Sequence, residues 1–395
     1  MAQIRKILHF DLDAFYCAVE ELRDPSLKGK AFAVGARPEE RGVVASCSYA
    51  ARKFGVHSAM PMSQAMRLCS NLIIVSRRHG VYEQTSKQVM ERLYALTPLV
   101  ERVSIDEAFL DMTGSRESAE ALARQLQKTI NMELGLSCSL GVATNKLVAK
   151  IANNVGKAEV RSDNPPNAIK VIVPETEADF LAPLPIQAIW GVGPKTAARL
   201  ESLGIRTVGQ LARQSETDLV RRFGKHGQVL LHYARGIDPD PIETIREAKS
   251  ISKETTFTKD VRDVDVLEGT LLHLSEGIGR ELRTEKLTCR TLSLKFRYPD
   301  FTTLTRQVTL SEPADMDHQI YEGARRLFKQ VWRPGQLVRL LGVSATKLSA
   351  GGEQLSLWDT DDKKKRKMQN TVDEIRGKFG DQSVRWGKET KRGDA

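Results

Sequence analysis

The feature that most constrains this chain is a short apolar run that ends in acidic residues. Residues 7–12 read as a buried strand, and Asp11 and Asp13 flank its last apolar residue. Because side chains alternate along a strand, both carboxylates are predicted to lie on one face while Leu12 points the other way. Two carboxylates at the end of a buried strand need a cation, although a lone Asp-x-Asp is more often a cap or a turn.

A second acidic pair, Asp106 and Glu107, lies at the turn of a hairpin predicted over residues 100–112. Alone it reads as a polar turn. Together the two pairs suit phosphoryl transfer to a hydroxyl, for which about three oxygen ligands gather two Mg²⁺ ions roughly 3.5–4 Å apart. A triphosphate also needs cations, and Tyr49 and Arg52 place a hydroxyl and a guanidinium one helical turn apart, unless this is a solvated helix face.

Apolar periodicity and chain breakers divide the sequence into several regions. Strands and helices alternate irregularly up to about residue 169, which predicts an α+β fold with an antiparallel or mixed sheet. Residues 183–237 read as short helices broken by glycines, the prolines at 239 and 241 indicate a stiff linker, and 249–348 again mix strands and helices. From residue 349 on, glycines and the cations at 363–367 indicate a tether.

Compartment and charge narrow the class of protein. No apolar run approaches the roughly 18 residues of a membrane span, and Asp11 interrupts the first one before a signal-peptide core can form. Five cysteines, never spaced as a CxxC pair, argue against a disulfide framework or a zinc site. We therefore expect a cytoplasmic protein with reduced cysteines. Its net charge of +10 suits a polyanionic partner without requiring one.

Four ordered segments resemble the signature blocks of a known enzyme family. They read HFDLDAFY at residues 9–16, SYAARKFGV at 48–56, SIDEAFLD at 104–111 and GVATNKLVAKIA at 141–152. In this order they resemble the Y-family DNA polymerases, in the bacterial DinB branch, and the resemblance extends from about residue 6 to 348.

The resemblance implies an α+β right-hand polymerase with palm, fingers, helical thumb and an α/β little finger. The expected bounds are 1–15 and 80–169 for the palm, 16–79 for the fingers, 170–238 for the thumb, 239–248 for a linker, 249–348 for the little finger, and 349–395 for a flexible tail.

The resemblance also implies roles for the acidic residues. Asp11, Asp106 and Glu107 correspond to the catalytic carboxylates of the palm. With the backbone carbonyl of Leu12 they would hold two Mg²⁺ ions, for which Mn²⁺ could substitute.

The incoming dNTP would be bound by neighbouring residues. Tyr49 and Arg52 correspond to the fingers pair that contacts the triphosphate, and Lys157 to a palm lysine that serves the same phosphates. Tyr16 corresponds to the steric gate against a 2′-hydroxyl, unless it is a half-buried core tyrosine. The segment 158–168 departs from the short Pro-(Asn/Asp)-Gly turn that generally follows this lysine, because it is longer and more charged.

Residues 189–205 resemble a helix-hairpin-helix that includes Gly191, Gly193 and Lys195. Its glycines let the backbone approach a phosphate, and amides at a helix start donate to phosphate oxygens without reading sequence. A plain helical turn is the alternative.

Cations in the last domain are expected to follow the DNA backbone, unless they form a solvated strand face. Lys295 and Arg297 share a predicted strand face, and Arg339 and Lys347 flank the final strand. Ser344 stands where some relatives carry a cation, which would soften the grip on DNA.

The peptide QLSLW at residues 354–358 lies in the predicted tether. Its apolar side chains would be exposed to water unless a partner buries them. It resembles the bacterial sliding-clamp-binding peptide, with Trp where Phe is commoner, although short peptides also match by chance. The expected contacts are Gln354, Leu355, Leu357 and Trp358.

The resemblance implies a monomeric, error-prone translesion polymerase that adds dNTPs to a primer 3′-hydroxyl on a DNA template. No proofreading exonuclease motif is visible. The alternative is a catalytically silent clamp- and DNA-binding scaffold of the same fold. Relatives of that kind lack acidic residues at the catalytic positions, whereas this chain has all three.

Overall fold

The computed structural model describes residues 4–160, 164–351, 360–380 and 383–384. Contacts divide the chain into two units, the first made of residues 1–38 and 42–246 and the second of residues 39–41 and 247–395. Among the described helices, none combines the length and the apolarity that a membrane span requires.

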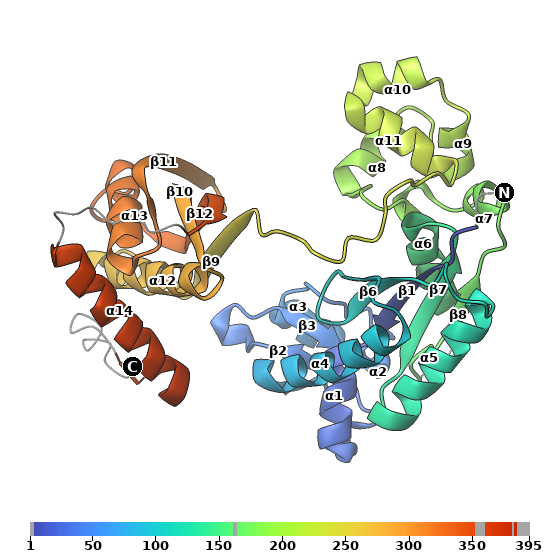
Figure 1. The fold of residues 1–395 in the computed structure, drawn as a ribbon, viewed down its shortest axis with the longest axis horizontal. Coiled ribbons are helices and arrows are strands. Elements are labelled where there is room, and N and C mark those ends of the chain that lie inside the picture. Colours follow the sequence, from blue (N-terminus) through green and yellow to red (C-terminus); the bar gives the residue numbers. More distant parts are fainter. Residues whose placement is uncertain (1–3, 161–163, 352–359, 381–382, 385–395) are drawn as a thin grey trace. The chain divides into compact units, whose positions relative to one another are not determined.

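A five-stranded sheet forms the centre of the first unit (Figure 1). Its order is β5 (Val100–Arg102), β6 (Glu107–Asp111), β1 (Ile7–Leu12), β7 (Cys138–Ala143) and β8 (Ile169–Val171). Strand β1 pairs antiparallel with both β6 and β7, whereas β8 runs parallel to β7. The predicted mixed sheet is therefore confirmed, with the acidic strand paired on both sides.

Alternation along β1 sends its side chains into two different layers. Leu8, Phe10 and Leu12 pack with helices α4 (His79–Leu96) and α5 (Ala119–Leu134) in one core. Ile7 lies in a second core with helix α6 (Lys146–Glu159) on the opposite face. Since Asp11 shares the face of Ile7, helix α6 covers the acidic end of the sheet.

Helix α6 lies unusually close to β7 because residue 141 is glycine. A Cβ atom at Gly141 would lie 1.9 Å from the carbonyl oxygen of Ala149. Since Gly141 is directly opposite His9 in the register, this close approach brings α6 down onto β1 as well.

A smaller three-stranded sheet occupies residues 32–75 of the first unit. Its order is β3 (Val44–Cys47), β2 (Phe32–Gly35) and β4 (Ile73–Val75), accompanied by α1 (Phe15–Arg23), α2 (Tyr49–Arg52), α3 (Met62–Leu68) and the single turns η1 (Pro25–Leu27) and η2 (Pro38–Glu40). Strand β4 runs parallel to β2, a pairing that the sequence pattern did not predict.

Short helices follow the five-stranded sheet along the chain, as predicted. They are α7 (Glu177–Leu181), η3 (Ile186–Ala188), α8 (Pro194–Glu201), α9 (Val208–Ala212), α10 (Glu216–Phe223) and α11 (Lys225–Ala234). Their apolar side chains share one core with α6. A hydrogen bond also connects the segment after α11 to α6, because the carboxylate of Asp238 accepts the N–H of Leu147 at 3.0 Å in the first turn of α6.

The second unit is an antiparallel sheet with helices on one face. Its strand order is β11 (Thr303–Ala314), β10 (Leu287–Arg297), β12 (Val338–Ala350) and β9 (Ser250–Val261). Helices α12 (Val264–Thr284) and α13 (Asp317–Val331) pack apolar residues against Leu292, Leu294 and Phe296 of β10.

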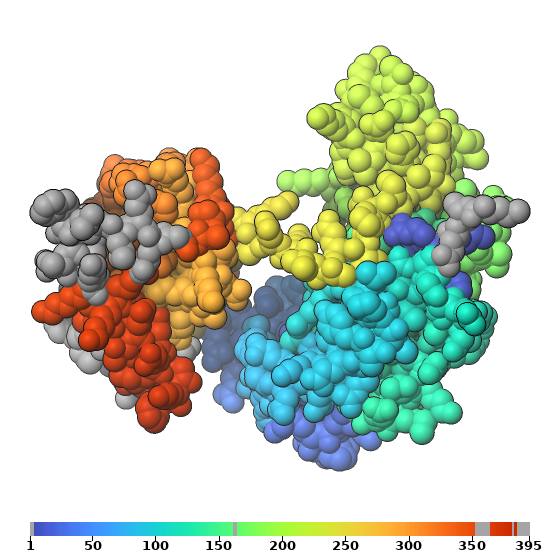
Figure 2. All heavy atoms as spheres, in the orientation of Figure 1, coloured from blue at the N-terminus to red at the C-terminus, as the bar shows by residue number. Residues whose placement is uncertain are grey.

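The expectation of a flexible tail from residue 349 is wrong for much of that segment. Strand β12 continues to Ala350, because it pairs with β10 as far as Leu287. Helix α14 (Thr360–Phe379) follows and lies against the rest of the second unit (Figures 1 and 2).

Charged side chains dock α14, in place of an apolar stripe. Arg283 of α12 donates to Asp373 at 2.7 Å and to Asp317 at 2.9 Å, and Arg376 contacts Glu276 at 3.2 Å. Both Arg376 and Glu276 are only 4% exposed. Since these partners are polar, the sequence pattern resembles that of a solvated helix.

Candidate active site

The three predicted catalytic carboxylates lie at the same end of the paired strands β1 and β6. Asp11 lies directly opposite Glu107 in the antiparallel register, which places both side chains on one face with Cβ atoms about 4.5–5.5 Å apart. Asp106 lies in a bend just before β6. The N–H of Leu12 in β1 donates a 3.0 Å hydrogen bond to the carbonyl oxygen of Asp106, which joins this bend to β1.

Two lysines of α6 reach these carboxylates. Lys150 donates to Oε1 of Glu107, and Lys157 lies 2.5 Å from Oδ1 of Asp11 and 3.1 Å from Oδ1 of Asp13. Residues seven apart share one helix face, so α6 presents both ammonium groups to the acidic end of the sheet. The longer segment after Lys157 therefore leaves this lysine beside the carboxylates.

Asp13 has a structural environment that differs from that of Asp11. It is fully buried and accepts hydrogen bonds from Ser137 at 2.8 Å, from Ser139 at 2.9 Å and from the N–H of Asn167 at 3.0 Å. The prediction that Asp11 and Asp13 face the same side agrees with their shared contact to Lys157. Both carboxylate oxygens of Asp13 accept hydrogen bonds from the protein. Asp11 is therefore the more accessible carboxylate of the pair.

Burial and neighbouring charges shift the pKa values in this cluster. Burial raises the pKa of Asp106. The hydrogen bond from Ser104 lowers this pKa, whereas the charges of Asp11 and Glu107 raise it, and the net shift is upward. Although burial alone would raise the pKa of Glu107, hydrogen bonds from His9 and Lys150 lower it to about 2. Three carboxylates that repel one another at one edge of a sheet favour a bound cation.

The donor set fits a hard divalent cation, since Asp11, Asp106 and Glu107 supply carboxylate oxygens of the kind that Mg²⁺ prefers. Within the part of the chain that the structure describes, however, no three His, Cys, Asp or Glu side chains are gathered so that they could hold a metal ion. In this structure Glu107 and Asp11 are instead paired with Lys150 and Lys157.

Two buried polar residues extend the cluster, and the sequence analysis did not identify either of them. Nε2 of His9 lies 2.5 Å from Oε1 of Glu107, and Nδ1 of His9 lies 2.9 Å from Nδ2 of Asn153. Burial lowers the pKa of His9, partly offset by Glu107. The spacing of Lys150, Asn153 and Lys157 at i, i+3 and i+7 was the available signal, because it forms a polar stripe on α6.

Tyr49 and Arg52, the residues predicted to contact the triphosphate, both lie on α2. Ser48 caps α2 by accepting the N–H of Ala51 at 3.2 Å, and the guanidinium carbon of Arg52 lies 4.5 Å from the ring centroid of Tyr49. Burial and the charge of Asp13 raise the pKa of Tyr49, so its hydroxyl remains protonated.

Tyr16 lies on α1, close to the acidic cluster at the end of β1 and β6. Burial raises its pKa, and the charge of Asp106 raises it further. Its ring stacks on Tyr82 with centroids 4.2 Å apart and an interplanar angle of 16°. The hydroxyl of Tyr82 donates to the buried Glu20 at 2.8 Å, which fixes the plane of the stack.

The predicted helix-hairpin-helix glycines lie before α8. Gly191 has φ of +87°, which an L side chain rarely adopts, and Gly193 is the N-cap of α8. A Cβ atom at either glycine would meet no atom within 4 Å, so the backbone here is accessible to a large ligand such as a phosphate. Lys195 is exposed in the first turn of the same helix.

The predicted cations of the last domain lie on β10 and β12. Lys295 pairs with Glu254 at 2.8 Å, and Arg297 donates to Thr303 at 2.8 Å. The prediction that Arg339 and Lys347 flank the final strand is wrong, because β12 is longer than expected and contains both. Arg339 lies at a register shift and stacks 4.3 Å from the ring of Phe301, while Lys347 has φ of +52°.

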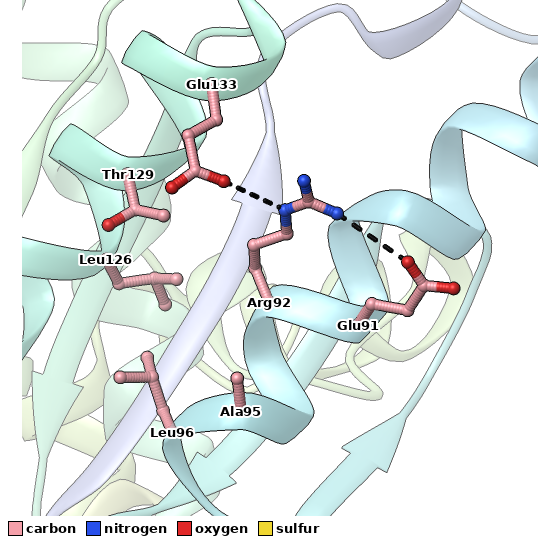
Figure 3. A pocket seen from close by; sticks show the side chains of 7 residues that line it. All are labelled: Glu91, Arg92, Ala95, Leu96, Leu126, Thr129 and Glu133. Atoms are coloured by element: carbon pink, nitrogen blue, oxygen red, sulfur yellow. Dashed lines mark hydrogen bonds and ion pairs between the residues drawn. The ribbon is translucent and has the colours of Figure 1, made fainter.

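The predicted clamp-binding residues 354–358 lie outside the described residues. A cavity of about 390 Å³ lies between α4 and α5, where Arg92 bridges Glu91 and Glu133 above Leu96 and Leu126 (Figure 3). Because none of its lining residues is a predicted site residue, this cavity is not the candidate active site.

Known proteins resemble this chain along most of its length. Three family models match it: the impB/mucB/samB family over residues 10–154, the C-terminal domain of that family over 248–357, and the IMS family HHH motif over 174–205. DNA polymerase IV of Desulfatibacillum aliphaticivorans is 40% identical over 385 residues, which cover 96% of this chain and 95% of the relative. DNA polymerase IV of Listeria innocua serovar 6a is 41% identical over 87% of this chain and 95% of its own length.

A solved structure gives the same result. The chain is similar to a "Y-family DNA polymerase chimera Dbh-Dpo4(243-245)-Dbh", with a TM-score of 0.75 and 28% identity over 87% of this chain and 98% of the chimera.

Proposed function

Since the chain belongs to the DinB branch of the Y-family DNA polymerases and is a DNA-directed DNA polymerase, we propose that it performs error-prone translesion synthesis through Asp11, Asp106 and Glu107. The observation that carries the catalytic assignment is the register of β1 and β6, which sets Asp11 directly opposite Glu107 with Asp106 in the adjoining bend.

Asp11, Asp106, Glu107 and the backbone carbonyl of Leu12 would hold two Mg²⁺ ions. When bound, these ions lower the pKa of the primer 3′-hydroxyl and neutralise charge on the triphosphate. The protein's own contribution is positioning, because the paired strands fix where the carboxylates lie before substrate arrives.

Cationic and hydroxyl groups around the carboxylates would bind the incoming dNTP. Lys157 contacts Asp11 and would exchange this partner for a phosphate oxygen, since an ammonium group binds either anion. Tyr49 and Arg52 would hold the triphosphate from the fingers. Tyr16, supported by the stacked Tyr82, would exclude a 2′-hydroxyl.

The translesion assignment rests on family membership and on the size of the proposed fingers. Residues 16–79 contain a three-stranded sheet and short helices, and we infer that so small a body encloses the new base pair loosely. We assign the palm to 1–15 and 80–169, the thumb to 170–238 and the little finger to 249–348. Gly191, Gly193 and Lys195 would contact the DNA backbone, and residues 354–358 would bind a sliding clamp.

A substitution at Asp106 tests the catalytic assignment. Asp106→Asn keeps the shape of the side chain and removes its charge, so we expect primer extension to be lost while the affinity for primer-template DNA stays unchanged. Extension is measured on a labelled primer and DNA affinity by fluorescence anisotropy. Extension by the variant at the rate of the unmodified enzyme would refute the assignment. If the unmodified chain bound DNA without extending the primer, it would be the silent scaffold.

A further inference from the structure

A buried hydrogen-bonded chain connects α6 to the candidate catalytic carboxylate Glu107. Its members are Asn153, which is 1% exposed, and His9, which is completely buried in the middle of β1. Asn153 approaches Nδ1 of His9 at 2.9 Å, and Nε2 of His9 approaches Oε1 of Glu107 at 2.5 Å. A buried histidine is costly unless both ring nitrogens find partners, and here both do.

The partners of Asn153 determine which ring nitrogen carries the proton. Nδ2 of Asn153 also lies 3.1 Å from the carbonyl oxygen of Ser139 and 3.4 Å from that of His9. Carbonyl oxygens only accept hydrogen bonds, so this atom is the amide nitrogen and donates. It therefore donates to Nδ1 of His9, which leaves the proton on Nε2. The Nε2–H group then points at Oε1 of Glu107 and donates to it.

We propose that His9 is a positioning residue for the polymerase reaction, which as the Nε2–H tautomer holds Oε1 of Glu107 in place. This inference rests on the proposed catalytic role of Glu107. It adds a residue that touches neither substrate nor metal and acts by orienting a carboxylate that does.

The two oxygens of Glu107 are divided between the protein and the active site. Oε1 accepts from both His9 and Lys150, whereas no donor among the described residues reaches Oε2. Fixing one oxygen of a carboxylate defines the direction of the other. A hydrogen bond of this kind orients a metal-binding carboxylate before the metal ion arrives. Its loss commonly lowers activity or metal affinity about 10–100-fold.

Ring packing alone does not account for a histidine at this position. The imidazole packs edge-on against Phe109 with centroids 4.8 Å apart, a contact that a phenyl ring would make as well. An apolar ring would, however, remove the imidazole acceptor of the buried Asn153 amide and would give Glu107 no neutral donor. The polar chain, and not the volume of the ring, therefore sets the requirement.

Three variants separate positioning from packing. His9→Leu removes the donor, His9→Gln returns an amide N–H near the position of Nε2, and Phe109→Leu removes the edge contact while leaving the hydrogen bonds intact. In single-nucleotide incorporation on a primed template, we expect His9→Leu to lower the maximal rate about 10–100-fold with unchanged affinity for DNA. We expect His9→Gln to recover most of that loss and Phe109→Leu to keep the rate within about threefold.

Nitrogen chemical shifts of histidine test the tautomer without any turnover. The chain has seven histidines, so selective ¹⁵N labelling together with His9→Gln assigns the His9 signal. The expected pattern is a neutral ring protonated at Nε2. A neutral ring protonated at Nδ1 would overturn the inference, as would equal rates for His9→Leu and the unmodified enzyme.

A failure of the proposed function would look different. Glu107→Gln should abolish incorporation if Glu107 is catalytic. Normal incorporation by Glu107→Gln refutes the role of Glu107 and the inference with it. Loss of incorporation in Glu107→Gln together with a normal rate in His9→Leu refutes only the positioning role. A His9→Gln variant as slow as His9→Leu would also refute it, because the donor would then not matter.

Discussion

Substituting Gly141 by alanine probes how closely α6 must approach the sheet. The added Cβ would lie 1.9 Å from the carbonyl oxygen of Ala149 and 2.5 Å from the backbone nitrogen of Asn153. Both are backbone atoms in the middle of a helix, so no side chain can rotate away. Since real Cβ contacts begin near 3.0 Å, the helix must withdraw by about 1.1 Å, the difference from 1.9 Å.

Such a withdrawal should affect stability and catalysis together. Overpacking of this kind costs about 1–3 kcal/mol, which for a body of roughly 240 residues lowers the melting temperature by about 2–12 °C. Helix α6 also carries Lys150 and Lys157 to the carboxylates, and a 1 Å misplacement can cost about 100-fold in rate. We therefore expect Gly141→Ala to lower single-nucleotide incorporation about 100-fold at a temperature where the protein remains folded.

Calorimetry and rapid-quench incorporation measure the two effects. Gly80→Ala is the matched control, because Gly80 lies in α4 of the same unit and an added Cβ there would meet no atom within 4 Å. Its melting temperature should stay the same or rise slightly, since alanine favours a helix. A Gly141→Ala enzyme that melts and incorporates like the unmodified protein would show that α6 tolerates a larger separation, and the reasoning would fail.

Three other perturbations test separate parts of the molecule. Tyr16→Ala should raise ribonucleotide incorporation at least about tenfold while dNTP incorporation persists, as measured by the ratio of kcat/KM values; an unchanged ratio would make Tyr16 a core residue only. The double substitution Leu357→Ala and Trp358→Ala should leave incorporation on a short primer intact and remove stimulation by a loaded clamp on primed circular DNA; full stimulation would exclude the peptide as the contact. Arg376→Leu removes the guanidinium that contacts the buried Glu276, so α14 should be held less tightly and its amides should exchange at least about tenfold faster with deuterium; unchanged protection would contradict a docking role for the ion pair.

Local patterns predicted the strands that carry the acidic residues. Strand β1 was recognised because an apolar run changes to acidic residues at a fixed point, and the hairpin of β5 and β6 because Asp106 and Glu107 separate two apolar segments. Each of these features is contained within about a dozen consecutive residues, where alternation and turn chemistry are decisive. The meeting of the two pairs was inferred from chemical need and from the family resemblance.

Features that depend on distant partners were missed. Strands β4 and β8 have three residues each, and their parallel pairing depends on segments far away in the chain. The inward face of α14 carries Asp373 and Arg376, which look solvated until Arg283 and Glu276 are placed opposite them. His9 likewise looked like an isolated polar residue in a strand, because its partners come from β6 and α6.

The double pairing of β1 bears on where the length of this chain can vary. A residue inserted between Ile7 and Asp11 would turn the carboxylate of Asp11 to the opposite face, because side chains alternate and both neighbouring strands hold the register. A deletion would do the same. The segment 158–168 begins at the end of α6, beyond Lys157, so extra residues there leave the lysine in place. Length changes should therefore be tolerated after α6 and should be lethal to activity within the first strand.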